Sequence, residues 1–169
     1  MLDGPGRTNP MRGPRPGLPA PGLPVSGGVR VLARMYAAGY DRLAARLDLR
    51  GAGDHRRRLG GGAEGVVLEV GVGTGRNLPL YRGVARVVAL EPDPVMRARA
   101  GRAARSAKVP VTVVGGDAMR LPFRDASFDT VVCSLVLCTV ADPRRALGEI
   151  RRVLRPGGML STSRTKYVA

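Results

Sequence analysis

The segment from Val66 to Leu78 constrains the fold of this chain more than any other part of the sequence. Four of the five residues from Val66 to Val70 are apolar, and a short valine-rich run of this kind predicts a strand buried on both faces. Glycines then occupy alternate positions, so the backbone can turn without placing side chains between itself and a bound group. These glycines are Gly71, Gly73 and Gly75.

A helix is expected directly after this turn. Asn77 can cap a helix that begins near Leu78, and Pro79 would fall in its first turn, where the missing N–H costs little. A strand, a glycine turn and a helix in this order predict a doubly wound α/β sheet, which binds ligands at its strand ends.

The rest of the chain continues the alternation of strand and helix. Further strands are expected over Ala85–Leu90, Pro110–Val114 and Phe128–Leu137, with a fifth beginning near Met159. Helices are expected over Val95–Ala107 and from Pro143, after the cap Asp142, until Pro156-Gly157-Gly158. The buried stripe of the second helix would be Ala146, Leu147, Ile150, Val153 and Leu154. This alternation predicts a parallel sheet of about five strands.

Two regions differ in composition. Residues 1–28 hold half of the 14 prolines and many glycines, and they predict a disordered arm; residues 29–169 would form one domain. Within that domain, residues 29–50 show helical spacing of apolar residues with arginines on another face. A helix packed on the sheet or its ligand mouth is favoured over a basic helix that makes peripheral membrane contact.

The chain has a formal net charge of +15, which could indicate a nucleic-acid partner. Lys108 and Lys166 are the only lysines among 28 basic residues, and the arginines are scattered without basic-aromatic alternation. A compositional bias is therefore the better interpretation, and no specific nucleic acid is expected. Cys133 and Cys138 are too few for an extracellular disulfide framework, and neither a membrane-spanning run nor a signal peptide is evident, so a cytoplasmic location is expected.

Acidic residues follow two further strands of the predicted sheet. Glu91 ends the strand after the glycine turn, twenty residues beyond Gly71, where a carboxylate can accept hydrogen bonds from a ribose diol. Asp117 follows the third strand and could accept from the exocyclic amine of adenine, with Met119 beside the ring; the alternative is a turn-forming aspartate. A dinucleotide fingerprint would place its third glycine where Arg76 stands, which disfavours an NAD-dependent oxidoreductase.

Taken together, these features resemble the class I methyltransferases that use S-adenosylmethionine. Val67–Gly75 is similar to their first motif, Glu91 to their ribose acid, Gly116–Ala118 to their adenine segment and Arg152–Gly158 to their late turn. The segments Leu121–Phe123 and Ser127–Asp129 are similar to the branch of ubiquinone and menaquinone methyltransferases. Val131–Val140 most resembles the methyltransferase-like thiol methyltransferases.

The resemblance implies a Rossmann-like fold, S-adenosyl-L-methionine as cofactor and a small-molecule acceptor: a thiol, a quinone-like compound or a lipid. It implies that Gly71, Gly73 and Gly75 line the methionine and ribose portion, and that Ser134 or Leu135 lies beside the methyl group. Glu69 would hold the glycine turn or the methionine end. The implied cofactor set is Glu69, Gly71, Gly73, Gly75, Glu91, Pro92, Asp117, Ala118, Met119, Ser134 and Leu135.

No catalytic base and no metal site are nominated. A sulfonium already carries an activated methyl group, so transfer depends on alignment more than on acid–base chemistry. Cys133 and Cys138 are expected to be small strand residues and not nucleophiles.

The sequence departs from the family pattern after Gly158. The family sheet has seven strands, and the last two are expected to be missing here, while Ser161–Lys166 is polar where the fifth strand should continue. An exposed sheet edge would then favour self-association. A truncated, catalytically impaired remnant that only binds the cofactor is the alternative to an active enzyme.

Overall fold

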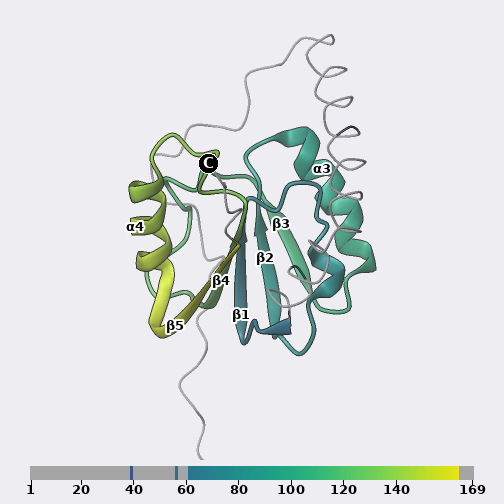
Figure 1. Cartoon of the computed structure of the whole chain (residues 1–169). Helices are drawn as coiled ribbons and strands as arrows, with labels where there is room; N and C mark the ends of the chain where they lie inside the picture. The colour runs from purple at the N-terminus through teal and green to yellow at the C-terminus, as the bar shows by residue number, and fades with distance from the viewer. Residues whose placement is uncertain (1–38, 40–55, 57–60, 164–169) are drawn as a thin grey trace, which may run out of the picture.

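The computed structural model describes residues 61–163 together with residues 39 and 56 (Figure 1). The strands are β1 (Val66–Val70), β2 (Arg86–Leu90), β3 (Val111–Val114), β4 (Phe128–Ser134) and β5 (Leu154–Ser163). The helices are α3 (Pro94–Ala103) and α4 (Pro143–Val153), and single 3-10 turns form η2 (Leu78–Leu80) and η3 (Ala104–Ser106). No helix in this described part is long and apolar enough to span a membrane. The predicted arm at 1–28 and, apart from residue 39, the predicted helix at 29–50 lie outside the described residues.

The strands form one parallel sheet in the order β3-β2-β1-β4-β5 (Figure 1). β1 occupies the centre, where Glu69 lies opposite Ala89 of β2 and Val132 of β4. The chain builds outward from β1 to β3 on one side and then crosses to β4 on the other. This reversal beside β1 is where doubly wound sheets open a ligand crevice at their carboxyl edge. The predicted α/β, Rossmann-like fold class is confirmed.

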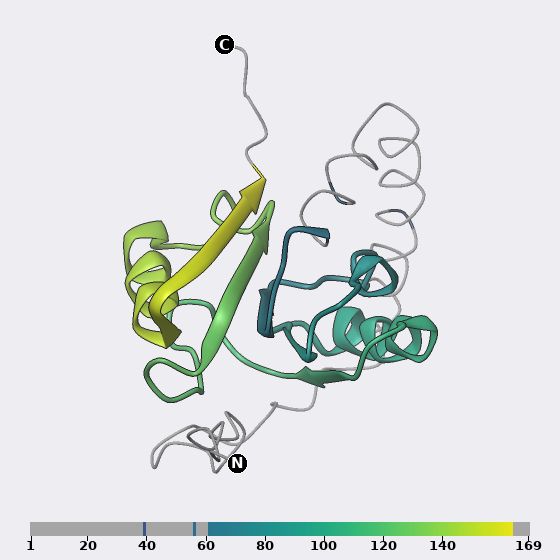
Figure 2. The same ribbon diagram turned by 90° about the horizontal axis from the view of Figure 1, so that it is seen from below.

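Side chains of the strands alternate between two apolar layers. Leu68 of β1 packs in a layer with Ile150 of α4, whereas its neighbour Val67 packs in a layer with Ala100 of α3. Figure 2 shows the two helices on opposite sides of the sheet. Because both faces are covered, β1 is buried along its whole length, as its apolar sequence predicts.

The helix expected after the glycine turn is only the short 3-10 turn η2. Asn77 stands at its N-cap position, but its side-chain oxygen accepts no capping hydrogen bond, and its Nδ2 donates to Oε1 of Glu69 at 2.7 Å. The predicted capping role of Asn77 was therefore wrong.

Other boundaries also differ from the sequence prediction, and β2 and β3 each begin one residue later than predicted, at Arg86 and Val111. α3 ends at Ala103 and continues as η3, and β4 ends at Ser134 because Leu135 adopts a left-handed backbone with φ +58°. α4 ends at Val153, so Leu154 begins β5 and Leu147 is 40% exposed, which removes both from the predicted buried stripe.

β5 begins five residues earlier than predicted. Pro156-Gly157-Gly158 does not stop a helix but lies inside the strand, at a register shift against β4. The polar segment that begins at Ser161 does not end the strand at once, because Ser161 and Thr162 still pair with Val132 and Cys133 of β4. Ladder hydrogen bonds are made by backbone atoms, so polar side chains are compatible with pairing at the sheet edge.

Candidate cofactor site at the carboxyl edge of the sheet

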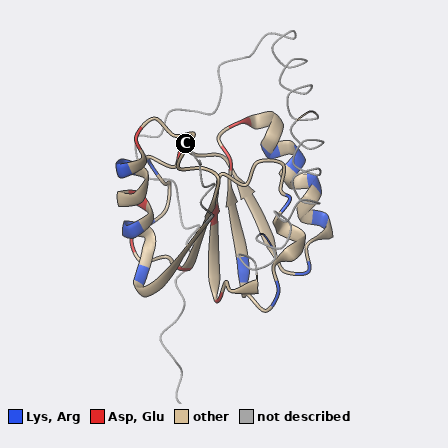
Figure 3. Ribbon diagram, viewed as in Figure 1, with Lys and Arg blue, Asp and Glu red and all other residues tan. Residues whose placement is uncertain are grey.

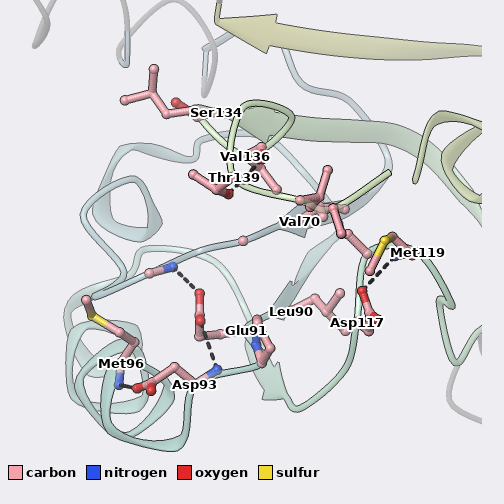
Figure 4. A pocket seen from close by; sticks show the side chains of 17 residues that line it. Val70, Leu90, Glu91, Asp93, Met96, Asp117, Met119, Ser134, Val136 and Thr139 are labelled. Atoms are coloured by element: carbon pink, nitrogen blue, oxygen red, sulfur yellow. Dashed lines mark hydrogen bonds between the residues drawn. The ribbon is translucent and has the colours of Figure 1, made fainter. Parts of the chain in front are cut away.

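A pocket of about 800 Å³ opens at the carboxyl ends of β1, β2, β3 and β4 (Figure 4). We call it the main pocket. It brings together nine of the eleven residues predicted for the cofactor: Gly71, Gly73, Glu91, Pro92, Asp117, Ala118, Met119, Ser134 and Leu135. Glu69 and Gly75 do not line it.

The glycine turn forms one wall of the main pocket. Gly71 has φ +66°, and a Cβ atom built there would lie 2.3 Å from Cγ2 of Val136. Gly73 has φ +58°, but a Cβ atom there would meet nothing within 4 Å. Gly71 is therefore required by packing against the loop after β4, whereas Gly73 leaves its backbone open to a ligand.

Gly75 serves a different purpose from the one predicted. Its φ is +86°, and an added Cβ atom would lie 2.9 Å from both Cα of Ala100 and Cβ of Ala103. Gly75 thus lets the turn pack closely against α3 and does not line the main pocket. The predicted contact between Gly75 and the cofactor is not supported by this geometry.

Glu91 joins the end of β2 to the glycine turn. Its Oε2 atom accepts a hydrogen bond from the backbone N–H of Gly73 at 2.9 Å, and its Oε1 atom accepts from Asp93 N–H at 3.0 Å (Figure 4). The residue is only 8% exposed. Since each carboxylate oxygen has two lone pairs, both oxygens can still accept from a diol.

Asp117 lies across the main pocket from the glycine turn. Its Oδ1 atom accepts from the backbone N–H of Met119 at 2.9 Å, and Arg120 N–H donates to Asp117 O at 3.0 Å. The turn-forming role considered from the sequence is therefore present. Within the described part, Oδ2 of Asp117 has no such partner, so a pocket ligand can still use it.

Glu69 lies on the same face of β1 as Val67, the face that packs against α3, and it is part of a buried polar cluster. It accepts hydrogen bonds from Asn77 Nδ2 at 2.7 Å and from the hydroxyl of Tyr81 at 3.0 Å. Burial raises the pKa of the Glu69 carboxyl to about 7, although both hydrogen bonds lower it. Burial and the Glu69 charge also raise the pKa of Tyr81. The Glu69 carboxylate thus holds both ends of η2, through Asn77 before it and Tyr81 after it.

A second, small cavity of about 30 Å³ reaches Glu69. Gly71, Ser134 and Leu135 line both this small cavity and the main pocket, so the two adjoin each other. The buried Oδ1 atom of Asn77 has no hydrogen-bond partner among the described residues. The partners of Glu69 were missed from the sequence, where only the polar residues Asn77 and Tyr81 beside an otherwise apolar segment could have indicated them.

The remaining wall comes mainly from the loop after β4. Val136, Thr139, Val140 and Ala141 line it, and Met96 of α3 lies on the side of Glu91 and Asp93. Among the described lining residues, the only titratable groups are Glu91, Asp93 and Asp117. No group of three or more metal-binding side chains occurs in the described ranges.

Comparison with known proteins matches residues 68–162 to a family model described as a methyltransferase domain. Human thiol S-methyltransferase TMT1B is 43% identical over 106 residues, which covers 59% of this chain and 43% of that protein. The phosphatidylethanolamine N-methyltransferase of Cereibacter sphaeroides is 42% identical over 96 residues, covering 56% of this chain and 47% of its own. The demethylmenaquinone methyltransferase of Thermobifida fusca is 41% identical over 97 residues, which covers 56% of this chain and 41% of that protein. This chain therefore spans less than half the length of these relatives.

Solved structures share the fold. The crystal structure of an S-adenosylmethionine-dependent methyltransferase from Thermotoga maritima aligns with a TM-score of 0.59 at 32% identity. The alignment covers 76% of this chain and 58% of that chain.

Proposed function

Because this chain belongs to the class I S-adenosylmethionine-dependent methyltransferases, we propose that its main pocket binds S-adenosylmethionine for methyl transfer to a small-molecule acceptor. The single observation that carries this proposal is the placement of Glu91 against Gly73. A carboxylate with spare lone pairs adjoins a stretch of backbone that has no side chain above it. The Glu91 carboxylate can accept from a ribose diol, and the open backbone at Gly73 lets the rest of the ligand approach closely.

Each part of the cofactor has a proposed partner among the described residues. Glu91 accepts from the ribose hydroxyls, and Asp117 accepts from the adenine amine through Oδ2, with Met119 beside the ring. The open backbone of Gly73 faces the ribose and methionine portion, with Gly71, which packs against Val136, beside it. Pro92 and Ala118 complete the nucleoside walls, and Ser134 and Leu135 lie towards the methyl group.

The cofactor, when bound, supplies an activated methyl group on a sulfonium. The described residues then contribute alignment and exclusion of water, since in-line transfer needs the reacting atoms held at close range. The apolar loop after β4 covers this end of the main pocket, where no histidine, lysine or arginine lines the described wall. The acceptor must therefore reach its nucleophilic form without a strong base from these residues.

This lining favours an apolar thiol over the other two acceptor classes. The loop residues at this end, Val136, Val140 and Ala141, are apolar and suit an apolar acceptor. A thiolate is itself the nucleophile and needs no base from the protein once it has ionised in solution, which agrees with a described wall that lacks a basic side chain. The thiol S-methyltransferase relative agrees with this choice.

The alternative of a cofactor-binding remnant is not favoured. The family match extends into β5 as far as residue 162, and the relatives named above are methyltransferases. The NAD-dependent oxidoreductase is disfavoured by the same match.

We further propose a reducing, cytoplasmic setting, since Cys133 and Cys138 are both free.

β5 pairs only with β4 within the described sheet, so its other edge is proposed to mediate self-association. Concentration-dependent sedimentation tests that contact. Flotation with anionic vesicles, comparing the full chain with one that lacks residues 29–50, tests the less favoured alternative that this segment contacts a membrane surface.

The acceptor assignment is tested by supplying S-adenosylmethionine with an apolar alkyl thiol, a quinol or phosphatidylethanolamine vesicles. Formation of S-adenosylhomocysteine measures transfer. We expect turnover with the thiol, increasing with pH up to the pKa of the thiol itself. Turnover with the vesicles alone would contradict the assignment, and absence of transfer despite cofactor binding would favour the remnant.

A further inference from the structure

The loop that follows β3 carries the residues proposed to contact adenine, and it is held from outside the main pocket by α4. We call residues 117–125 the adenine-side loop. Asp117, Ala118 and Met119 at its start line the main pocket. Its remaining residues run along α4, which lies on one face of the sheet and contributes no lining residue to the main pocket.

Arg152 and Glu149 of α4 bind the second half of this loop. Arg152 donates to three loop acceptors: Leu121 O at 3.0 Å, Phe123 O at 2.8 Å and Asp125 Oδ1 at 2.8 Å. Glu149 Oε2 accepts from Leu121 N–H at 2.8 Å and, with Oε1, from the Arg152 guanidinium at 2.8 and 2.7 Å. A planar guanidinium that makes several such bonds fixes the loop in one position.

Arg145, two turns earlier on α4, acts nearer to the main pocket. Its Nε atom donates to Met119 O at 3.1 Å, and the N–H of that same residue, Met119, donates to Asp117 Oδ1. Two hydrogen bonds therefore connect an exposed arginine to the carboxylate that faces the pocket. Two other arginines of α4, Arg144 and Arg151, are exposed, and their side chains make no hydrogen bond within the described residues. Figure 3 shows basic residues spread over both α3 and α4, so charge alone does not distinguish Arg145.

We propose that α4 positions the adenine-side loop and thereby Asp117. Arg145 acts through Met119. The Glu149–Arg152 pair acts through Leu121 and Phe123. This inference rests on the proposed function, because it assumes that Asp117 accepts from the adenine amine. Arg145, Glu149 and Arg152 are positioning residues and touch no ligand. Their effect is on the selectivity of the site for its base, in addition to any effect on stability.

The test compares two ligands on the full chain: S-adenosylhomocysteine and its inosine analogue, in which oxygen replaces the amine. The readout is the ratio of the two dissociation constants by calorimetry, together with the melting temperature without ligand. We expect Arg145→Met to reduce the preference for adenine by about fivefold, the effect of misplacing one hydrogen bond. Arg145→Lys should restore it, since an ammonium can also donate to Met119 O.

Arg144→Met is the matched control on the same exposed turn and should leave the ratio unchanged. Glu149→Gln is the second variant: it retains the size of the side chain and weakens the anchorage of Leu121, so it should also reduce the ratio. A purely structural role would lower the melting temperature or weaken both ligands equally, with the ratio unchanged, and would overturn the inference. Absence of adenosyl binding by the unmodified chain would instead refute the proposed function, so the two failures can be distinguished.

Discussion

The backbone N–H of Gly73 donates to Oε2 of Glu91 at 2.9 Å, which ties the turn after β1 to the end of β2. The same carboxylate accepts from Asp93 N–H through Oε1, and Asp93 in turn caps α3 by accepting from Val95 N–H and Met96 N–H. One side chain thus fixes the relative position of the glycine turn and the helix that follows β2. The ligand-facing lone pairs of Glu91 are held in place before any ligand binds, which reduces the ordering required on binding.

Substitution of Gly73 should affect binding more than folding. Gly73→Ala adds a methyl group in open space within the main pocket, at a backbone with φ +58°. We expect a stability loss of about 1 kcal/mol from the left-handed backbone and a loss of affinity for S-adenosylhomocysteine of about tenfold or more from the obstructed approach. Urea unfolding and calorimetry measure the two effects.

Gly75→Ala should show the opposite balance. An added Cβ atom would lie 2.9 Å from Cα of Ala100, which is helix backbone and cannot move without shifting α3. We expect a loss of about 2–4 kcal/mol in the free energy of unfolding, with weaker binding only through the folded fraction. Equal losses of affinity in the two variants at conditions where both are folded would contradict the distinct roles assigned here.

Two helix glycines provide a contrast within the same chain. A Cβ atom at Gly101 of α3 or at Gly148 of α4 would meet nothing within 4 Å, and neither residue has a positive φ. Replacing each by alanine should stabilise the protein by about 0.5–1 kcal/mol, because alanine loses less backbone entropy in a helix. The midpoint of urea unfolding should rise in each single variant and further in the double variant; a fall in both would show that the two helices are not packed as described.

Glu69 should make stability depend on pH. Its folded pKa of about 7 exceeds the ordinary value of 4.5, so the folded protein binds more protons than the unfolded chain between these values. Stability therefore falls as pH increases from 4.5 to 7 and is constant above that window, as far as this group is concerned. Glu69→Gln removes the titration, so its stability relative to the unmodified protein should increase by about 2 kcal/mol between pH 5 and pH 8. Urea unfolding at the two pH values measures this, and a pH-independent difference would contradict it.

Tyr81 should modulate the same titration. Its hydroxyl donates to Glu69 Oε2 at 3.0 Å and lowers the pKa of the carboxyl. Tyr81→Phe should therefore cost about 1–3 kcal/mol at pH 8, where Glu69 is ionised, and less at pH 5. In the Glu69→Gln background the pH dependence of the Tyr81→Phe effect should disappear. If the pH dependence of the Tyr81→Phe effect persisted in the Glu69→Gln background, it would belong to another titratable group.

The sheet could be predicted from the sequence because buried parallel strands are short apolar runs separated by turn residues. Val66–Val70 and the apolar part of Phe128–Leu137 show this pattern, and both form neighbouring strands. The pocket residues at strand ends follow from the same reasoning, since parallel strands place all their carboxyl ends at one edge. Glu91 and Asp117 were found in this way, and both line the main pocket.

The roles of individual residues depend on contacts that sequence spacing does not reveal. Alternate glycines locate a turn, but only the position of α3 decides that Gly75 faces a helix whereas Gly73 faces the pocket. Asn77 has the residue type of a cap, yet its Nδ2 donates to a buried carboxylate eight residues earlier and its oxygen caps nothing. Pro156 and the two glycines after it are typical of a helix end, but α4 has already ended at Val153 and they form an irregular part of β5.

The central claim is that an adenosyl ligand binds in the main pocket, with its ribose on Glu91 and beside the open backbone of Gly73. Calorimetric titration of S-adenosylhomocysteine into the unmodified chain and into Glu91→Ala tests it most directly. We predict saturable one-to-one binding to the unmodified chain and an affinity about tenfold or more lower in the variant, the effect of losing hydrogen bonds to a charged group. Equal affinities in two folded proteins would contradict the claim.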